Sequence, residues 1–405
     1  MIISFLIRCI REVSWRLLFK AGWLWCFKSF FALRAFKNRN KHDILFPPFL
    51  FFSLTTACNL HCRGCWVTQE KGHNVSPVSL PLEKIERVIQ IGQQNSVYFY
   101  TLLGGEPFLT TTMWELIEHH PEAYFQVITN GQFFDTNNVK RLKKLGNVSP
   151  LISIDGFETE NDARRGLGTF IKAINGCQEL CRQKLLYGVA TVVTAQNFES
   201  VLTEVYIRQF IELGAVYLWY YIYRPVGMDS ASELAVNREQ LSELRKRLLR
   251  LRRKMPIILI DTYWDAQGKA VCPASKGMAF VVGAKGSIEP CPPITVARNF
   301  LDDNNGDFYK TINESNFLRH FQQFVRDRYD GERSQGCVLI DYPQELAEFL
   351  RQEQVVDLSG RNFLTELDTA IPKTSHFLPG EEIPENYWVY RLLKQNLFFG
   401  IGAYG

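Results

Sequence analysis

Segments typical of strands alternate with segments typical of helices through residues 48–225, and this alternation leaves few folds open to the chain. Six apolar and β-branched runs have the length of buried strands. They cover residues 50–55, 96–103, 123–129, 148–154, 187–193 and 215–223. Amphipathic periodicity predicts helices between them, over residues 82–94, 112–120, 136–145, 170–183 and 199–213. Such strands pair in parallel, so we expect an α/β fold, either a partial (β/α)6 barrel of the TIM type or an open doubly wound sheet.

The composition agrees with a large folded core. Apolar residues make up 46% of the 405 residues and charged residues 22%, which excludes a disordered or collagen-like chain. Ten cysteines in a chain of this length are too sparse for a secreted disulfide scaffold. We therefore expect reduced thiols and a cytoplasmic location.

Residues 1–41 form a basic, aromatic arm. They hold nine lysines and arginines against Glu12 alone, a net charge of +8, whereas the other residues bring the chain to +4. Apolar side chains fall at helical spacing on one side, without the roughly 18 uncharged apolar residues that a membrane-spanning helix needs. No signal-peptide cleavage pattern is present after them. The arm predicts peripheral binding to an anionic membrane on its cytoplasmic face; the alternative is packing on the rest of the chain or on another subunit. Nucleic acid is not an expected partner.

Three cysteines come after the first predicted strand, within TTACNLHCRGC. Cys58, Cys62 and Cys65 have the spacing C-x3-C-x2-C. Three thiolates on one short loop can bind three irons of a cuboidal iron–sulfur cluster and leave the fourth iron open. A structural zinc site usually has four ligands, so the spacing favours the cluster.

Further motifs come after the next three strands, and together they resemble the radical S-adenosylmethionine (SAM) superfamily over residues 48–225. The cysteine loop looks like the cluster loop of that family. Gly104-Gly105-Glu106-Pro107 looks like its GGEP motif. Thr129-Asn130-Gly131 and Ser153-Ile154-Asp155-Gly156 end the third and fourth strands, as in many members. One departure is Gly64, where many members carry an aromatic residue.

The resemblance implies a [4Fe–4S] cluster on the three cysteines, with SAM bound beside it. Two glycines after a strand let the backbone approach the methionine ammonium group. Glu106 is expected to fix this loop or to reach a ribose hydroxyl, and Ser153 to bind the ribose or the carboxylate. Arg164 or Arg165 would pair with the carboxylate; the alternative is a surface arginine. The expected cofactor-binding residues are Gly104, Gly105, Glu106, Pro107, Asn130, Ser153, Asp155, Arg164 and Arg165.

A second group of cysteines lies downstream. Cys272, Gly286 and Cys291 have the spacing C-x13-G-x4-C, and Cys337 comes later in SQGCVLID. This part is similar to the SPASM or twitch extensions of radical SAM enzymes, which hold auxiliary clusters, but the dense cysteine run of a SPASM domain is missing. We expect at most one auxiliary iron–sulfur cluster, held by these three cysteines; the alternative is structural or free thiols.

The predicted organisation has four parts. The arm (1–41) precedes the radical SAM core (48–225), an α+β auxiliary-cluster extension (226–345) and a tail (346–405). The tail contains another aromatic, basic and amphipathic stretch at residues 385–399.

The resemblance implies an enzyme that cleaves SAM with one electron from an external reductant of the ferredoxin or flavodoxin type. The resulting 5′-deoxyadenosyl radical would abstract hydrogen from an organic substrate, while the protein aims the radical and excludes water. The basic arm suggests a lipid-like substrate at a membrane surface. The SPASM-like part suggests peptide modification. A third hypothesis is an iron–sulfur electron carrier or scaffold. The sequence assigns no catalytic residue beyond the cofactor ligands.

Overall fold

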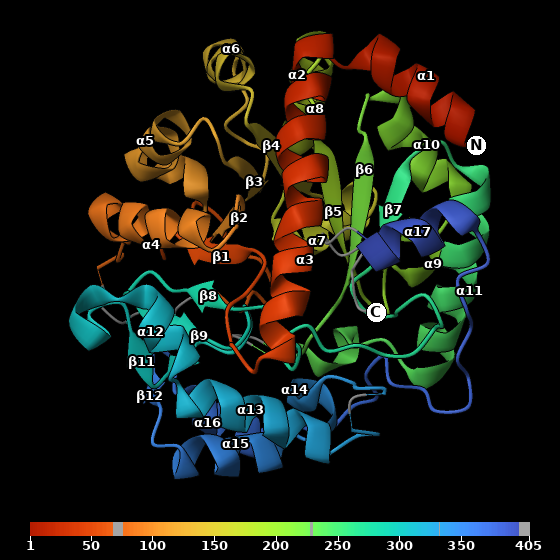
Figure 1. Ribbon diagram of the computed structural model, residues 1–405. Helices are drawn as coiled ribbons and strands as arrows, with labels where there is room; N and C mark the ends of the chain where they lie inside the picture. The colour runs from red at the N-terminus through yellow and green to blue at the C-terminus, as the bar shows by residue number, and fades with distance from the viewer. Residues whose placement is uncertain (68–75, 227–229, 332, 397–405) are drawn as a thin grey trace.

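One ten-stranded sheet organises the computed structural model, which describes residues 1–67, 76–226, 230–331 and 333–396 (Figure 1). Its strand order is β11-β9-β8-β1-β2-β3-β4-β5-β6-β7. The central strands are β1 (Leu50–Ser53), β2 (Phe99–Leu103), β3 (Tyr124–Thr129), β4 (Val148–Ser153), β5 (Gly188–Val193) and β6 (Tyr217–Ile222). Each of these strands pairs in parallel with the next, which confirms the predicted alternation and the partial barrel.

The sheet curves enough for side chains of distant strands to meet inside it. The hydroxyl of Tyr217 on β6 lies 2.8 Å from Ser149 Oγ on β4 and accepts a hydrogen bond from Gln126 on β3 at 3.2 Å. Because side chains alternate along a strand, Ser153 lies on the same inner face as Ser149. Ser153 is the last residue of β4, so this face leads directly to the mouth of the barrel.

Helices cover the outer face of the strands in the expected order. They are α4 (Leu82–Gln94), α5 (Thr111–His119), α6 (Thr136–Leu145), α7 (Glu158–Arg165), α8 (Thr169–Arg182), α9 (Phe198–Val201) and α10 (Glu204–Glu212). Asp135 caps α6 by accepting hydrogen bonds from the N–H groups of Asn137 and Asn138. The helix predicted over 199–213 is broken, because Thr203 accepts a hydrogen bond from the Tyr206 N–H group and starts a new helix.

Residues beyond β6 extend the same sheet at both edges. β7 (Ile258–Ile260) adds beside β6, and β8 (Val281–Val282) pairs in parallel with β1. β9 (Ser287–Glu289) and β11 (Asn299–Phe300) then continue in antiparallel fashion. The remaining elements are α11 (Arg238–Lys254), β10 (Val296–Ala297), α12 (Phe308–Asn313), α13 (Asn316–Asp327), α14 (Val338–Asp341), α15 (Pro343–Gln352), β12 (Val356–Asp357), α16 (Phe363–Thr369) and α17 (Trp388–Asn396).

The arm is a chain of helices that crosses the start of the barrel strands. It consists of α1 (Ile2–Glu12), α2 (Trp15–Ala21), the π-helix η1 (Gly22–Phe27) and α3 (Lys28–Lys41). Figure 1 shows α3 running in front of the strands. The ring of Trp25 lies 5.4 Å from those of Tyr124 and Tyr217 and 6.1 Å from that of Phe99, the first residues of β3, β6 and β2. Trp25 therefore closes the barrel at the end opposite to its mouth.

The inner face of the arm packs on the body, as the alternative interpretation of the sequence predicted. Leu17, Leu24, Leu33 and Phe36 are buried there. Five of the nine cations of the arm bind backbone carbonyl oxygens of the body. They are Arg8, Arg16, Lys20, Lys28 and Arg39. No helix within the described ranges combines the length and the apolar character needed to cross a bilayer.

Candidate active site

The cysteine loop lies at the mouth of the barrel, directly after β1. Cys58, Cys62 and Cys65 are half-buried free thiols on one short segment. The N–H group of Cys65 donates a hydrogen bond to the carbonyl oxygen of Cys62 at 3.1 Å, and the N–H group of Leu60 lies 3.4 Å from Cys58 Sγ. Burial is the main cause that raises the pKa of Cys58, to about 11, and that also raises the pKa of Cys62. A bound cation that stabilises the thiolates would lower these values.

The glycine loop after β2 is hydrogen-bonded to the cysteine loop. The N–H groups of Gly105 and Glu106 donate to the carbonyl oxygens of Thr55 and Ala57, at 2.7 and 2.8 Å. A Cβ atom on Gly105 would overlap the Ala57 carbonyl, so this close approach requires glycine. Both amide groups are thus occupied. Among the described residues none donates to the carbonyl oxygens of Gly104 and Gly105, which remain for an ammonium group.

Glu106 joins this loop to the end of β3 by hydrogen bonds. Its buried carboxylate accepts hydrogen bonds from the N–H group of Asn130 and the hydroxyl of Thr129, both at 2.8 Å, and from the N–H group of Phe108 at 3.2 Å. Burial raises the pKa of Glu106 to about 7, although the three donors favour its charged form. Pro107 comes next, as the first residue of a short 3-10 helix, Pro107–Leu109.

Asn130 joins the end of β3 to the cysteine loop. Its side-chain amide donates to Asn59 Oδ1 at 2.8 Å, and its own oxygen accepts from the N–H group of Gln132 at 3.1 Å. Asn59 lies next to Cys58 in the sequence. Asn130 thereby holds the cysteine loop, and the sequence signal for this role is the asparagine inside the cysteine motif.

Asp155, Arg164 and Arg165 form a nearly buried ion cluster beside Cys62. Both guanidinium groups contact Asp155 Oδ2, and the Arg165 Nε atom lies 2.7 Å from it. Burial acts to raise the pKa of Asp155, but Arg165 and Arg164 outweigh it and hold the pKa below its usual range. Nη1 of Arg165 lies 4.0 Å from Cys62 Sγ. Both arginines already pair with Asp155, so a ligand carboxylate would have to compete with Asp155 for them.

Ser153 is the predicted residue best placed to meet a ligand. It is half-buried at the end of β4, and its hydroxyl lacks a hydrogen-bond partner within the part of the chain that the structure describes. Ser153 therefore presents a donor and an acceptor to the barrel mouth.

Two residues that the sequence did not assign also contact the cysteine loop. Tyr223, after β6, fills the space beside Gly64, where φ is +65° and where a Cβ atom would overlap the tyrosine hydroxyl. Arg361, from the tail, donates a hydrogen bond to the carbonyl oxygen of Trp66 at 2.8 Å. No sequence pattern links these positions, because they lie about 160 and 295 residues from the loop.

The downstream cysteines form a second group of thiols. Burial, followed by the charge of Cys337, raises the pKa of Cys272 to about 11. Burial, with Cys272 and Cys337, raises the pKa of Cys291 well above its usual value. Arg224, two residues after β6, contacts Cys337 and lies 5.7 Å from the ring of Tyr263. The structure thus places a cation between the barrel and this second group.

The donor chemistry of both groups fits iron–sulfur clusters. Within the described ranges, no three His, Cys, Asp or Glu side chains converge to hold a single metal ion. A cuboidal cluster binds each thiolate through a separate iron, so it needs thiols spread around one space. Cys58, Cys62 and Cys65 meet this requirement with a cation, Arg165, beside them.

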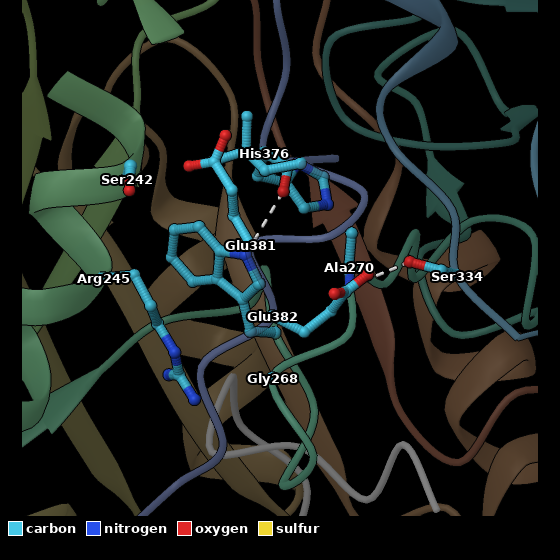
Figure 2. Close-up of a pocket in the computed structure, with 10 residues that line it drawn as sticks. Ser242, Arg245, Gly268, Ala270, Ser334, His376, Glu381 and Glu382 are labelled. Atoms are coloured by element: carbon cyan, nitrogen blue, oxygen red, sulfur yellow. Dashed lines mark hydrogen bonds between the residues drawn. The ribbon is translucent and has the colours of Figure 1, made fainter. Parts of the chain in front are cut away.

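The hollow in Figure 2 has no residue of the cysteine loop in its lining, and it is too small for a substrate. Its volume of about 10 Å³ is close to that of one water position. Trp264 Nε1 donates to the carbonyl oxygen of His376 there, and the Ala270 N–H group donates to Ser334 Oγ, each at 3.2 Å. Burial lowers the pKa of His376 to about 4. The hydrogen bond between Ala270 and Ser334 holds the segment that leads to Cys272.

The cysteine loop, the glycine loop and the Asp155 cluster lie in a segment that matches a known protein family. Residues 52–203 match the family model described as Radical SAM superfamily. They are a radical SAM domain. The domain begins in β1 and includes the cysteine loop, the glycine loop and the Asp155 cluster. The family uses a [4Fe–4S] cluster and SAM, so the predicted cofactors of this domain are confirmed.

Curated proteins resemble between about two fifths and three fifths of the chain. The mycofactocin maturase MftC of Mycolicibacterium smegmatis is 30% identical over 177 residues, which cover 42% of each chain. The sporulation killing factor maturation protein SkfB of Bacillus subtilis is 27% identical over 260 residues, or 62% of this chain and 61% of that protein. The chain thus spans less than two thirds of these relatives.

Solved structures support the partial barrel around the radical SAM domain. Streptococcus suis SuiB bound to S-adenosylmethionine has a TM-score of 0.58 and 18% identity, over 71% of each chain. AnSMEcpe with bound AdoMet has a TM-score of 0.57 and 18% identity, over 80% of this chain and 99% of that chain. At this identity the likeness supports the fold.

Proposed function

We propose that this protein is a radical SAM enzyme that modifies a peptide. The observation that carries this proposal is the joining of the cysteine loop to the glycine loop and to the end of β3, all at the open end of the barrel. An iron–sulfur electron carrier would need the thiols but not a glycine loop with two unoccupied carbonyl oxygens. This difference argues against the carrier or scaffold hypothesis.

When bound, a [4Fe–4S] cluster and SAM would supply one-electron radical chemistry, with a ferredoxin-type or flavodoxin-type reductant as the source of the electron. The residues of the chain bind and orient the cluster and SAM. Cys58, Cys62 and Cys65 hold the cluster, and the carbonyl oxygens of Gly104 and Gly105 bind the methionine ammonium group. Ser153 binds the ribose or the carboxylate.

The ion cluster has a positioning role in this proposal. Asp155 orients Arg165, whose guanidinium group lies beside Cys62 and balances thiolate charge. The same contact holds the C-terminal end of α7 against the cysteine loop, together with the hydrogen bond from the Arg63 N–H group to the carbonyl oxygen of Arg164 at 2.8 Å. Arg164 and Arg165 therefore contribute to SAM binding chiefly through the loop that they stabilise.

Cys272, Cys291 and Cys337 hold one auxiliary iron–sulfur cluster in our proposal. Three ligands would leave one iron open, and Arg224 would balance part of the negative charge of the thiolates. The N–H group of Cys337 donates to Ser375 Oγ at 3.1 Å, so the tail fixes this cysteine.

Two observations favour a peptide substrate. MftC and SkfB are both named for maturation, and SuiB has been solved with its precursor peptide SuiA. A short open reading frame for a precursor peptide beside the gene would support the assignment. The exposed apolar side chains of the arm support peripheral membrane association, and they favour a lipid-like substrate only if the barrel mouth faces the bilayer.

Iron content and SAM cleavage test the proposed chemistry. After anaerobic reconstitution, we expect about eight irons per chain for two clusters, and about four in the triple variant C58A/C62A/C65A. The variant should form no 5′-deoxyadenosine with dithionite. A matched triple variant, C9A/C26A/C181A, should retain both iron and cleavage. Iron without cleavage in the wild type would contradict the enzyme assignment and favour an electron carrier.

The second group of thiols can be tested in the same way. The variant C272A/C291A/C337A should keep about four irons and lose the other four. An unchanged iron content would contradict the auxiliary cluster while leaving SAM cleavage at the first cluster intact.

A further inference from the structure

The outer face of the arm exposes many large apolar side chains, although its inner face is packed on the body. Four of its side chains recur at helical spacings of three and four residues on α1. Five more recur every four residues through α2, η1 and α3. We call these nine residues the apolar stripe. They are Ile3, Leu6, Ile7, Ile10, Trp15, Phe19, Trp23, Phe27 and Phe31, each between 47% and 80% exposed.

The π-helix keeps the aromatic part of the apolar stripe together. In an α-helix, four residues turn about 40° past a full turn, so a spacing of four drifts around the helix. The wider turn of η1 reduces this drift. The rings of Trp23 and Phe27 stack at 4.6 Å, and those of Phe27 and Phe31 lie 4.9 Å apart. The same segment turns Trp25 inward, so one helix both closes the barrel and displays the stripe.

Cations gather at the same end of the molecule. Helices of a βα barrel run back toward the start of the next strand, so their C-terminal ends lie at the closed end. Basic side chains there complement the helix dipoles. Exposed examples are Lys144 in the last turn of α6, Lys184 after α8 and Lys254 in α11, and the arm adds Arg34 and Lys41.

An open basic groove lies at the end of α11. Its volume is about 410 Å³, and its lining residues are Lys246, Leu249, Arg250, Arg253, Lys254, Ile383 and Asn386. Lys254 pairs with Glu204 and Arg250 with Glu243, whereas Arg253 has no ion-pair partner among the described residues. The groove is close to the arm, because Arg8 of α1 donates to the carbonyl oxygen of Pro256 at 2.6 Å.

We propose that the closed end of the barrel docks on an anionic phospholipid bilayer, with the active-site mouth turned toward the aqueous phase. The substrate is then a water-soluble peptide segment and not a lipid taken from the bilayer. This inference rests on the proposed peptide-modifying function. Aromatic and aliphatic side chains of the apolar stripe enter the interface, while the exposed cations and the basic groove contact lipid phosphates.

The height of the barrel separates the two ends. Strands of five or six residues span about 20 Å, at about 3.3 Å per residue. Trp25 closes the end of the barrel at which the strands begin, and the cysteine loop follows the end of β1 at the mouth. A lipid in the bilayer would have to travel around the outside of the protein to reach Ser153. A peptide in solution enters the mouth directly.

Vesicle binding tests the docking face. We expect the reconstituted protein to float with phosphatidylcholine vesicles that contain phosphatidylglycerol and to bind pure phosphatidylcholine vesicles more weakly. Ile7→Glu and Phe19→Glu should each lower the affinity about tenfold, because each removes a side chain from the apolar stripe and adds negative charge. Ile371→Glu is the matched control, since Ile371 is equally exposed (67%, against 59% for Ile7) but lies in the tail. Equal binding by all three variants would overturn the proposal.

Hydrogen exchange on the vesicle-bound protein tests the orientation. Amides of residues 2–41 should become protected, whereas those of residues 54–67 should exchange as in solution. Protection of residues 54–67 would overturn the aqueous orientation and favour a lipid substrate. Formation of 5′-deoxyadenosine, measured in the same samples, reports separately on the radical SAM function. A stable dimer without vesicles that Ile7→Glu dissociates would instead assign the stripe to a second copy of the chain.

Discussion

At Gly64, the space that a side chain would occupy is filled by a tyrosine from the end of another strand. The backbone at Gly64 has a positive φ, and the ring of Tyr223 occupies the space that a side chain would need. Many radical SAM sequences have an aromatic residue at this place in the cysteine loop. Here the aromatic ring comes from the end of β6, so the loop retains an aromatic neighbour at its third cysteine.

Gly64→Ala should lower both stability and iron content. The alanine would adopt an unfavourable φ, at a cost of about 1 kcal/mol, and would collide with Tyr223. The variant Tyr223→Ala removes the collision, so the double variant should lose less than the sum of the two single losses. Denaturant unfolding and iron analysis of all four proteins measure this coupling. Strict additivity would show that Tyr223 does not fill the site.

Asp155→Asn should destabilise the protein by about 3–5 kcal/mol, because two nearly buried guanidinium groups lose their counter-ion. The low pKa of Asp155 means that its contribution is present above the pKa of the unfolded state and is lost as the pH falls through the folded value. The exposed pair Arg141–Glu118 provides the control, and Glu118→Gln should cost less than about 1 kcal/mol. Urea unfolding at neutral and acidic pH compares the two variants.

Most residues of the candidate site could be predicted, because they lie within one short loop or at the end of a predicted strand. Cys58, Glu106 and Ser153 each lie at or just after the end of a strand that the apolar pattern predicts, and parallel strands bring such positions together. Tyr223 and Arg361 reach the site through contacts that only the folded chain forms. The sequence showed the arginines after Asp155 but not that Asp155 already pairs with both.

At the scale of elements, a buried ion network fixes the last helix. Arg252 of α11 contacts Asp261 and donates to Glu385 Oε2 at 2.7 Å, and Lys394 of α17 lies 3.2 Å from Asp261. Tyr390 accepts a hydrogen bond from the Leu259 N–H group at 2.7 Å. The predicted stretch 385–399 thus packs on β7 over its described part, while residues 397–399 lie outside the described residues. Trp388 and Leu392 keep its other face exposed.

Lys394→Met should change how stability depends on pH. Burial, opposed by Asp261, lowers the pKa of Lys394 to about 8. A lysine with a lowered pKa binds its proton less tightly in the folded state, so the wild type should gain stability relative to the variant as the pH rises from about 8 to about 10.5. The relative gain should be on the order of 3 kcal/mol. Lys254→Met, at an exposed ion pair, should keep the wild-type dependence; parallel curves for wild type and Lys394→Met would contradict this assignment.

Trp25→Ala should destabilise the protein by about 3 kcal/mol, because the ring fills the closed end of the barrel against three strands. Trp23→Ala is the matched control on the same π-helix, and its exposed ring should contribute less than about 1 kcal/mol to folding. Thermal unfolding of the two variants gives the comparison. The helical nature of this segment was predictable from its periodicity, but its π-turn depends on Trp25 packing under the barrel.

At the scale of the molecule, the arm belongs to the folding unit. Removal of residues 1–41 would expose the first residues of β2, β3 and β6 together with the partners of Leu17, Leu24, Leu33 and Phe36. We expect a loss well above about 5 kcal/mol, comparable with the whole stability of many domains. The shortened chain should therefore aggregate, whereas Ile7→Glu should retain the melting temperature of the wild type. A soluble, cooperatively folding shortened chain would show that the arm is only an appendage.

The extension is also continuous with the barrel, which the sequence did not indicate. β8 pairs with β1, the strand that leads to the cysteine loop, and Cys291 comes after β9 of the same hairpin. The proposed boundary between core and extension therefore divides one sheet. A parallel pairing of two residues leaves too little signal in the sequence to predict that β8 and β1 are neighbours.

The contact between Arg8 and Pro256 has a consequence for the way the protein is made. These residues are 248 positions apart, so at about 5–20 residues per second the ribosome needs roughly 10–50 s to deliver the partner of the first helix. During that time the nascent arm has both an apolar inner face and an apolar outer face uncovered. Newly synthesised chains therefore present these faces to chaperones and lipid surfaces before the barrel exists to receive them.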